Sequence, residues 1–360
     1  MAIIEFNLGA DIKLIRDFFK NRNQKIKSGL IKECKKYYRV ILDTPAGIFW
    51  KGCTFEYDDD DLVDEHHPVF GCMKNFESDM EYLKQKNRRG DRNEKRLRLK
   101  RFNYDAGSGT LSITFGAIRY LEWQLLYNHM LGKKAEYSQG QFKKNLVLNK
   151  YLKEHKSGFE ETISILHGSK FPKDISSCLW SGCGCGVWVI TQDDYLIYTV
   201  RDSASVGTFQ GAYGYSTCGG CKYHQHDDDE KDIETLHSDP GIQVETYLRK
   251  KLAIEETDYD KSKLKCIGIG IDITRCLIQY SFCVKINKTK QQCEDDFDRA
   301  LADGRLRDAI EPSYCNFTEE NVYKLLSGQS MTDSHDKPKK MEPAGLVSLI
   351  KCWNDFKDIR

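Results

Sequence analysis

The sequence predicts an α+β protein made of two parts: a smaller mixed α/β region over residues 1–160, whose role is open, and a larger one over residues 161–360. Two patterns predict this class. Stretches that alternate apolar and polar residues, as half-buried strands do, are interspersed with stretches whose apolar residues recur at helical spacing. The length agrees, because 360 residues correspond to roughly two domains of about 150 residues each.

The first region is expected to form mainly hairpins and helices. In order, we predict a helix over residues 10–19, a hairpin of strands 37–42 and 48–50, a hairpin of strands 96–100 and 110–115, and a helix over 118–131. Both hairpins have turn-forming residues between two apolar stretches. The acidic run 56–61 and the basic run 84–101 are expected to be solvated loops or faces.

The second region has a more regular pattern. We predict a hairpin of strands 186–191 and 195–200, a glycine-rich loop at 207–220, a polar insertion at 222–237, a helix over 242–256, strands at 265–272 and 275–286, and helices at 291–302, 319–326 and 344–356. Ser238-Asp239-Pro240 predicts the start of the first of these helices, since it offers a cap and a proline for the first turn.

Charge and composition exclude several classes of protein. The 55 basic residues nearly balance 54 acidic ones, so no global field draws the chain to nucleic acid, and the basic run 84–101 is expected to protect a strand edge. No apolar run approaches the ~20 residues that span a bilayer, so no membrane partner is expected. Fourteen cysteines without a secretion signal predict reduced thiols and a cytoplasmic location.

The second region resembles the Nudix hydrolase family over about residues 183–286. The resemblance rests on a hairpin that ends in Arg201, a glycine-rich loop, a capped helix that leads to Glu255-Glu256, and two further strands. It implies an α-β-α sandwich with a mixed sheet and, as ligand, a nucleotide or another small molecule that carries phosphate. It also implies that Glu255 and Glu256 are catalytic and bind Mg²⁺, and that Arg201 contacts a substrate phosphate.

The motif departs from the family pattern in two places. Leu252 stands where the family has a glutamate, Lys251 replaces its arginine, and the loop ends at Cys221 without the expected acid. Asp227–Glu230 is a candidate replacement, or else simply a solvated loop. Three interpretations of Glu255-Glu256 are open: an active diphosphate hydrolase, a weak metal or phosphate site, and a solvated helix end in an inactive nucleotide-sensing or protein-interaction module.

A cysteine and histidine cluster predicts a second candidate site. Cys218 and Cys221 have the two-residue gap of zinc ligands, and His224 and His226 follow closely. A zinc-stabilised structural domain is therefore a further hypothesis, beside the hydrolase and the inactive binding module. The alternatives are a chance pair in a cysteine-rich chain, a redox pair, and a cysteine nucleophile assisted by a histidine. His66-His67 beside the acidic run is either a metal site or a charged loop.

Overall fold

The computed structural model describes most of the chain. The described residues are 16–18, 38–42, 47–86, 93–105, 107–131, 145–155, 180–201, 211–224, 237–273, 275–307, 309–328, 331 and 340–356.

The larger of two sheets is mixed and contains strands from both halves of the chain. Its strand order is β1-β10-β11-β6-β7-β12, while β2 pairs with β10, β8 with β7, and β9 with β6. β6 and β11 are parallel, and the other pairings in this sheet are antiparallel. The bounds are β1 Tyr38–Leu42, β2 Ile48–Phe49, β6 Cys183–Ile190, β7 Tyr195–Val200, β8 Tyr213–Gly214, β9 Thr217–Gly220, β10 Lys265–Asp272, β11 Leu277–Lys285 and β12 Pro312–Asn316.

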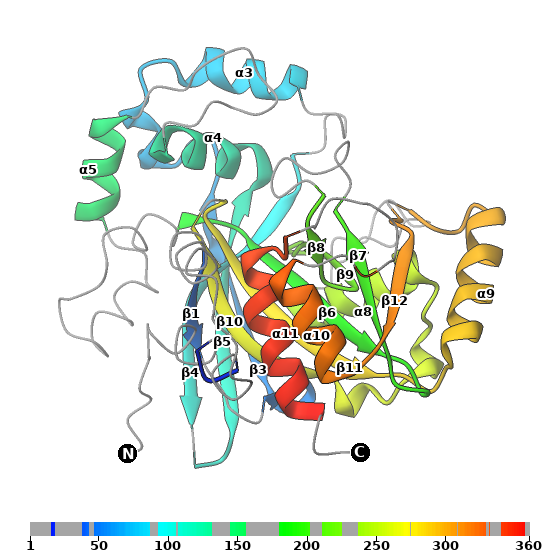
Figure 1. The fold of residues 1–360 in the computed structure, drawn as a ribbon. Helices are drawn as coiled ribbons and strands as arrows, with labels where there is room; N and C mark the ends of the chain where they lie inside the picture. The colour runs from blue at the N-terminus through cyan, green and yellow to red at the C-terminus, as the bar shows by residue number, and fades with distance from the viewer. Residues whose placement is uncertain are drawn as a thin grey trace.

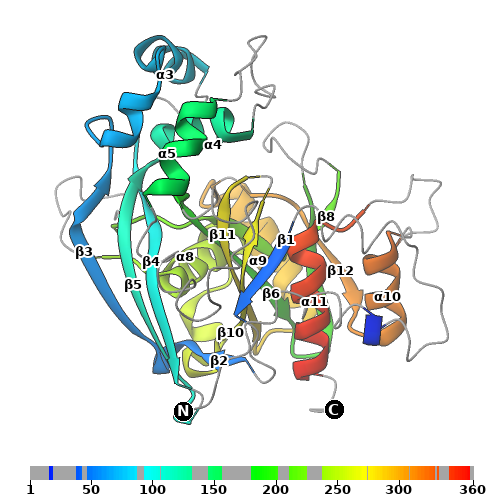
Figure 2. The same cartoon turned by 90° about the vertical axis from the view of Figure 1, so that its left-hand side faces the viewer.

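Helices cover both faces of this sheet (Figures 1 and 2). Helix α8 (Pro240–Leu252) packs against β6 and β9, whereas α10 (Glu319–Ser327) and α11 (Pro343–Phe356) lie on the opposite face. Side chains of β6 alternate between the two cores: Val189 joins the core on the α8 side, and Trp188 and Ile190 join the core under α11.

A smaller sheet, of order β3-β5-β4, covers the α8 side of the larger one (Figure 2). Aromatic side chains fill the space between the sheets, with ring centroids 4.9 Å apart for Trp50 and Phe282 and 6.3 Å apart for Phe115 and Tyr280. The two parts of the chain therefore share one core. The remaining bounds are β3 Thr54–Val63, β4 Lys95–Asp105, β5 Thr110–Arg119, α3 Phe76–Lys86, α4 Tyr120–Leu131, α5 Leu146–Glu154 and α9 Lys290–Ala302.

The α+β class is confirmed, and so are the hairpins β4–β5 and β6–β7. The hairpin predicted from strands 37–42 and 48–50 is wrong, because β1 and β2 each pair with β10. The larger sheet thus has strands from both sides of residue 160. The helix predicted over residues 10–19 lies mostly outside the described residues.

Of the two forms expected for the acidic run 56–61, a solvated loop or a solvated face, the structure shows a strand with exposed residues. This run lies within β3, which is parallel to β5. Asp61 forms an ion pair with Arg98 of β4, across the intervening strand β5. Gly116 of β5 makes this possible, because a Cβ atom there would lie 2.6 Å from the Asp61 carboxylate. Basic side chains of β4 offset the negative charge of the run, and the glycine leaves space for the Asp61 carboxylate.

Among the described residues, no helix has both the length and the apolar character needed to cross a bilayer.

Candidate functional site

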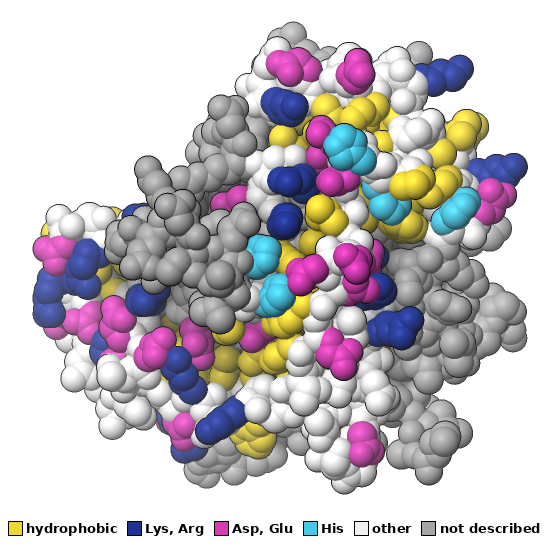
Figure 3. All heavy atoms as spheres, turned by 180° about the vertical axis from the view of Figure 1, so that it is seen from behind, with side chains coloured by type: hydrophobic (Ala, Val, Ile, Leu, Met, Phe, Trp, Pro, Cys, Tyr) yellow, Lys and Arg dark blue, Asp and Glu magenta, His cyan; other side chains and the backbone are white. Residues whose placement is uncertain are grey.

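Three potential metal ligands from separate segments meet beside the smaller sheet. Asp59 lies on β3, while His224 and His237 flank the polar insertion and form an isolated antiparallel bridge with each other. One ligand atom of each residue lies within 4.8 Å of the others. Figure 3 shows histidine and acidic side chains close together on the face seen from behind. We call Asp59, His224 and His237 the His–Asp triad.

Hydrogen bonds and aromatic rings hold the triad together. The Asp59 Oδ1 atom lies 3.0 Å from His237 Nε2 and accepts a hydrogen bond of 3.0 Å from the Tyr223 hydroxyl. The Tyr57 ring stacks on His237 with a centroid distance of 4.2 Å and an interplanar angle of 7°. These contacts fix the imidazole of His237 and the carboxylate of Asp59 against each other.

The triad has the chemistry of a metal site. Hydrogen bonds from His237 and then Tyr223 hold the pKa of Asp59 below its usual value, so the carboxylate is ionised at neutral pH. The Asp59 side chain is 66% exposed and that of His237 is 30% exposed, so solvent reaches the ligand atoms. Three protein ligands with an accessible side are typical of zinc sites that keep a position for water or substrate.

The structure separates the two cysteines of the predicted zinc cluster. Cys218 packs with the core under α11, whereas Cys221 is buried in the core on the α8 side. Residues three apart along an extended chain point to opposite faces, which agrees with this separation. Burial raises the pKa of the Cys221 thiol, which disfavours the thiolate. His224 does join a candidate site, but with Asp59 and His237, while His226 lies outside the described residues.

The helix predicted over residues 242–256 ends before Glu255 and Glu256. Helix α8 ends at Leu252, and Ala253 follows in the left-handed conformation with a φ of 55°. The Glu256 carboxylate then turns to Lys261, 2.8 Å away, and Lys261 also lies 3.1 Å from Glu245 of α8. The Lys261 ammonium group thus pairs with the carboxylates of Glu245 and Glu256 and balances part of their negative charge.

Asp227–Glu230, the proposed replacement for the missing loop acid, lies outside the described residues. Among the described residues, Glu255 starts a short 3-10 helix, where its backbone N–H donates to the Asp258 carboxylate over 2.6 Å.

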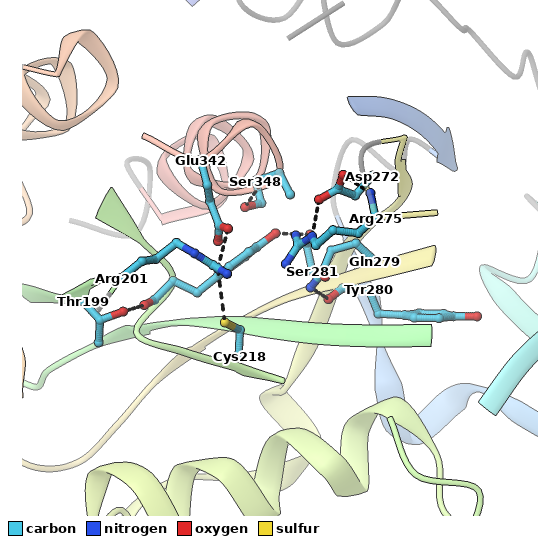
Figure 4. A network of polar contacts seen from close by, with 12 residues as sticks. Thr199, Arg201, Cys218, Asp272, Arg275, Gln279, Tyr280, Ser281, Glu342 and Ser348 are labelled. Carbon is cyan, nitrogen blue, oxygen red and sulfur yellow. Dashed lines mark hydrogen bonds and ion pairs between the residues drawn. The ribbon is translucent and has the colours of Figure 1, made fainter. Parts of the chain in front are cut away.

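Arg201 is buried, and its guanidinium donates to Glu342 over 2.6 Å (Figure 4). Cys218 lies 4.0 Å from the same Nη1 atom. A second pair, Asp272 and Arg275, lies nearby, with 2.5 Å between the Arg275 Nε atom and the carboxylate. Arg201 thus belongs to a charge-balanced network between the sheet and α11, and its predicted contact with a phosphate stays a hypothesis.

The other charged motifs form structural contacts. Arg96 binds Glu94 over 3.0 Å and the carbonyl of Gly220, so part of the basic run is used within the fold. The His67 Nδ1 atom accepts the backbone N–H of Val69 and caps a 3-10 helix. Neither residue of His66-His67 belongs to the described triad.

Comparison with known proteins adds no family assignment. No protein-family model matches the chain, and a search of curated proteins finds no match.

His237 did not stand out in the sequence, and Asp59 stood out only as part of an acidic run near His66-His67. The available signals were an acidic run and histidines on both sides of a polar insertion. These signals did not reveal the pairing, because the bridge between His224 and His237 and the approach of β3 depend on tertiary contacts.

Proposed function

We propose that this protein binds a divalent transition-metal ion through Asp59, His224 and His237. The observation that carries the proposal is that one potential ligand atom from each of these residues lies within 4.8 Å of the others. The residues are far apart in the sequence, because Asp59 lies about 165 residues before His224, which lies about 13 residues before His237. The surrounding hydrogen bond and stacked ring support the same function, because metal-binding side chains are commonly held in place by such neighbours.

The donor set favours zinc-like ions over magnesium. Imidazole nitrogen suits Zn²⁺, Cu²⁺, Fe²⁺ and Ni²⁺, whereas Mg²⁺ prefers oxygen ligands throughout. A bound zinc ion would activate water or polarise a substrate group at the accessible side. Asp59, His224 and His237 would hold the ion, and the earlier hypothesis of a zinc site is kept with this different ligand set.

Titration calorimetry with Zn²⁺ and with Mg²⁺ tests the proposal. We expect one equivalent of Zn²⁺ per chain and no measurable heat with Mg²⁺. His224→Ala and His237→Ala should each abolish zinc binding. His66→Ala is the matched control, because His66 is 86% exposed and lies outside the triad. Equal binding by all three variants would show that the triad is not the site.

A second proposal concerns the larger sheet. We infer that the Nudix-like part binds a nucleotide or another phosphate-bearing molecule without hydrolysing it at Glu255 and Glu256. The arrangement of α8 across β6 and β9, with the β6–β7 hairpin and β10–β11 in one mixed sheet, supports the Nudix-like part of this proposal. The ion pair between Glu256 and Lys261 supports the non-hydrolytic form, that of a nucleotide-sensing or protein-interaction module.

Binding and turnover assays with a panel of nucleoside diphosphate derivatives separate the two forms. We expect binding without Mg²⁺-dependent phosphate release. Release that Glu256→Gln abolishes, and that Glu320→Gln leaves intact, would instead establish a hydrolase. Glu320 is a suitable control because it is an exposed glutamate that also pairs with a lysine, Lys324, over 2.8 Å.

A further inference from the structure

Tyr223 contacts every member of the His–Asp triad. Its hydroxyl donates to Asp59 Oδ1 over 3.0 Å. Its ring meets the two imidazoles edge to face, with centroid distances of 5.0 Å to His224 and 5.2 Å to His237. No role for this tyrosine follows from its sequence position alone, next to His224 in a polar segment.

Tyr223 is also rigidly held. It is only 1% exposed and belongs to the core on the α8 side, whereas the Asp59 side chain is 66% exposed. A hydrogen bond from a buried ring to an exposed carboxylate restricts the carboxylate, which otherwise samples several rotamers in water. The hydrogen bond from this buried tyrosine therefore restricts the motion of Asp59, the most exposed residue of the triad.

We propose that Tyr223 is a positioning residue of the metal site, and that its hydroxyl prepares the Asp59 carboxylate to bind a transition-metal ion. The inference rests on the proposed metal-binding function. Oδ1 accepts the phenol hydrogen bond and also lies 3.0 Å from His237 Nε2, so the hydroxyl holds the carboxylate beside that imidazole. Without the hydroxyl, the Asp59 side chain would lose conformational entropy when the ion binds. This loss would weaken the affinity for the ion.

Tyr57 offers a matched control. Its ring also contacts His237 closely, at 4.2 Å, and lies 6.0 Å from the Tyr223 ring. The Asp59 carboxylate, however, accepts its tyrosine hydrogen bond from Tyr223. Tyr57→Phe and Tyr223→Phe each remove one hydroxyl and keep the ring, so only the second removes the hydrogen bond to the ligand.

Zinc affinity of the full chain, measured by competition with a chromophoric chelator, tests the role. We expect Tyr223→Phe to weaken binding by about 10–100-fold, as loss of an outer hydrogen bond to a metal ligand commonly does. Tyr57→Phe keeps the ring that stacks on His237 and should lose far less affinity than Tyr223→Phe. Thermal unfolding of both metal-free variants checks that the fold is intact.

A double-mutant cycle shows whether the hydroxyl acts through Asp59. In the Asp59→Asn background, Tyr223→Phe should cause no further loss of affinity, because the ligand that it positions is already altered. The visible absorption of bound Co²⁺ supplies an independent signal, since it reports coordination geometry. It should change more with Tyr223→Phe than with Tyr57→Phe.

Each outcome decides a different statement. Unchanged zinc affinity and an unchanged Co²⁺ spectrum in Tyr223→Phe would overturn the positioning role while leaving the metal site in place. Absence of zinc binding by the wild type would remove both the site and the role. A loss in Tyr223→Phe that persists in the Asp59→Asn background would show that the effect does not pass through the carboxylate, and would also overturn the role.

Discussion

The Asp239 carboxylate joins the start of α8 to the indole of Trp50, with 2.7 Å between Asp239 Oδ1 and Trp50 Nε1. The same oxygen accepts the backbone N–H groups of Gly241 and Ile242 and so caps the helix. Both Asp239 and Trp50 are 7% exposed. One buried carboxylate therefore orients α8 and attaches it to the N-terminal part of the chain.

Asp239→Ala should strongly destabilise the protein. The change removes a helix cap and leaves the buried Trp50 N–H without a partner, which together cost about 2–4 kcal/mol of unfolding free energy. Chemical denaturation measures the difference. Asp239→Asn keeps an accepting oxygen and should lose far less; equal losses in the two variants would contradict this role of the side-chain oxygen.

The same pair predicts a dependence on pH. Burial raises the pKa of Asp239, so the folded state holds this proton more tightly than the unfolded chain does. The contribution of Asp239 to stability should therefore fall as pH rises from the unfolded value of about 3.9 through the raised folded value, and then level off. The unfolding free energy of wild type minus that of Asp239→Asn, followed against pH, should show this fall; an increase would contradict it.

Gly241→Ala should disturb the same junction. A Cβ atom at this position would lie 2.1 Å from Trp50 Cδ1, so the indole or the helix must move. Such overpacking costs about 1–3 kcal/mol. Gly71→Ala is the control, because a Cβ there meets no atom within 4 Å. Similar melting temperatures for the two variants would show that the junction has room to adjust.

Removing one member of the buried pair Arg201–Glu342 should be costly. Their side chains are 8% and 1% exposed, so Glu342→Leu leaves a cation in the interior without this carboxylate. The expected loss is about 3–5 kcal/mol of unfolding free energy. The double variant Arg201→Met, Glu342→Leu should recover part of that loss, because it removes the buried charge as well. A double variant less stable than Glu342→Leu would argue against the pairing.

Gly116→Ala should weaken both the smaller sheet and the proposed metal site. A Cβ atom on β5 would push the Asp61 carboxylate away from Arg98 and displace β3, which carries Asp59. We expect lower stability together with weaker zinc binding. Gly52→Ala, which introduces no contact within 4 Å, should change neither property. Normal zinc affinity in a destabilised Gly116→Ala protein would show that the packing of the smaller sheet does not position the metal site.

Local sequence patterns predicted most of the elements in the second half of the chain. The Asp239-Pro240 cap, the β6–β7 hairpin, and helices α9, α10 and α11 all have signals that lie within a few residues of one another. Capping and apolar periodicity act over that range, so the residues themselves determine these elements.

Tertiary structure decided the rest. It paired β1 and β2 with β10 and made the acidic run a strand opposite basic side chains. It separated Cys218 from Cys221 and placed Asp59 beside His224 and His237. The reason is physical: strand pairing and ligand convergence depend on which distant segments are buried together, and spacing along one segment carries no information about that choice.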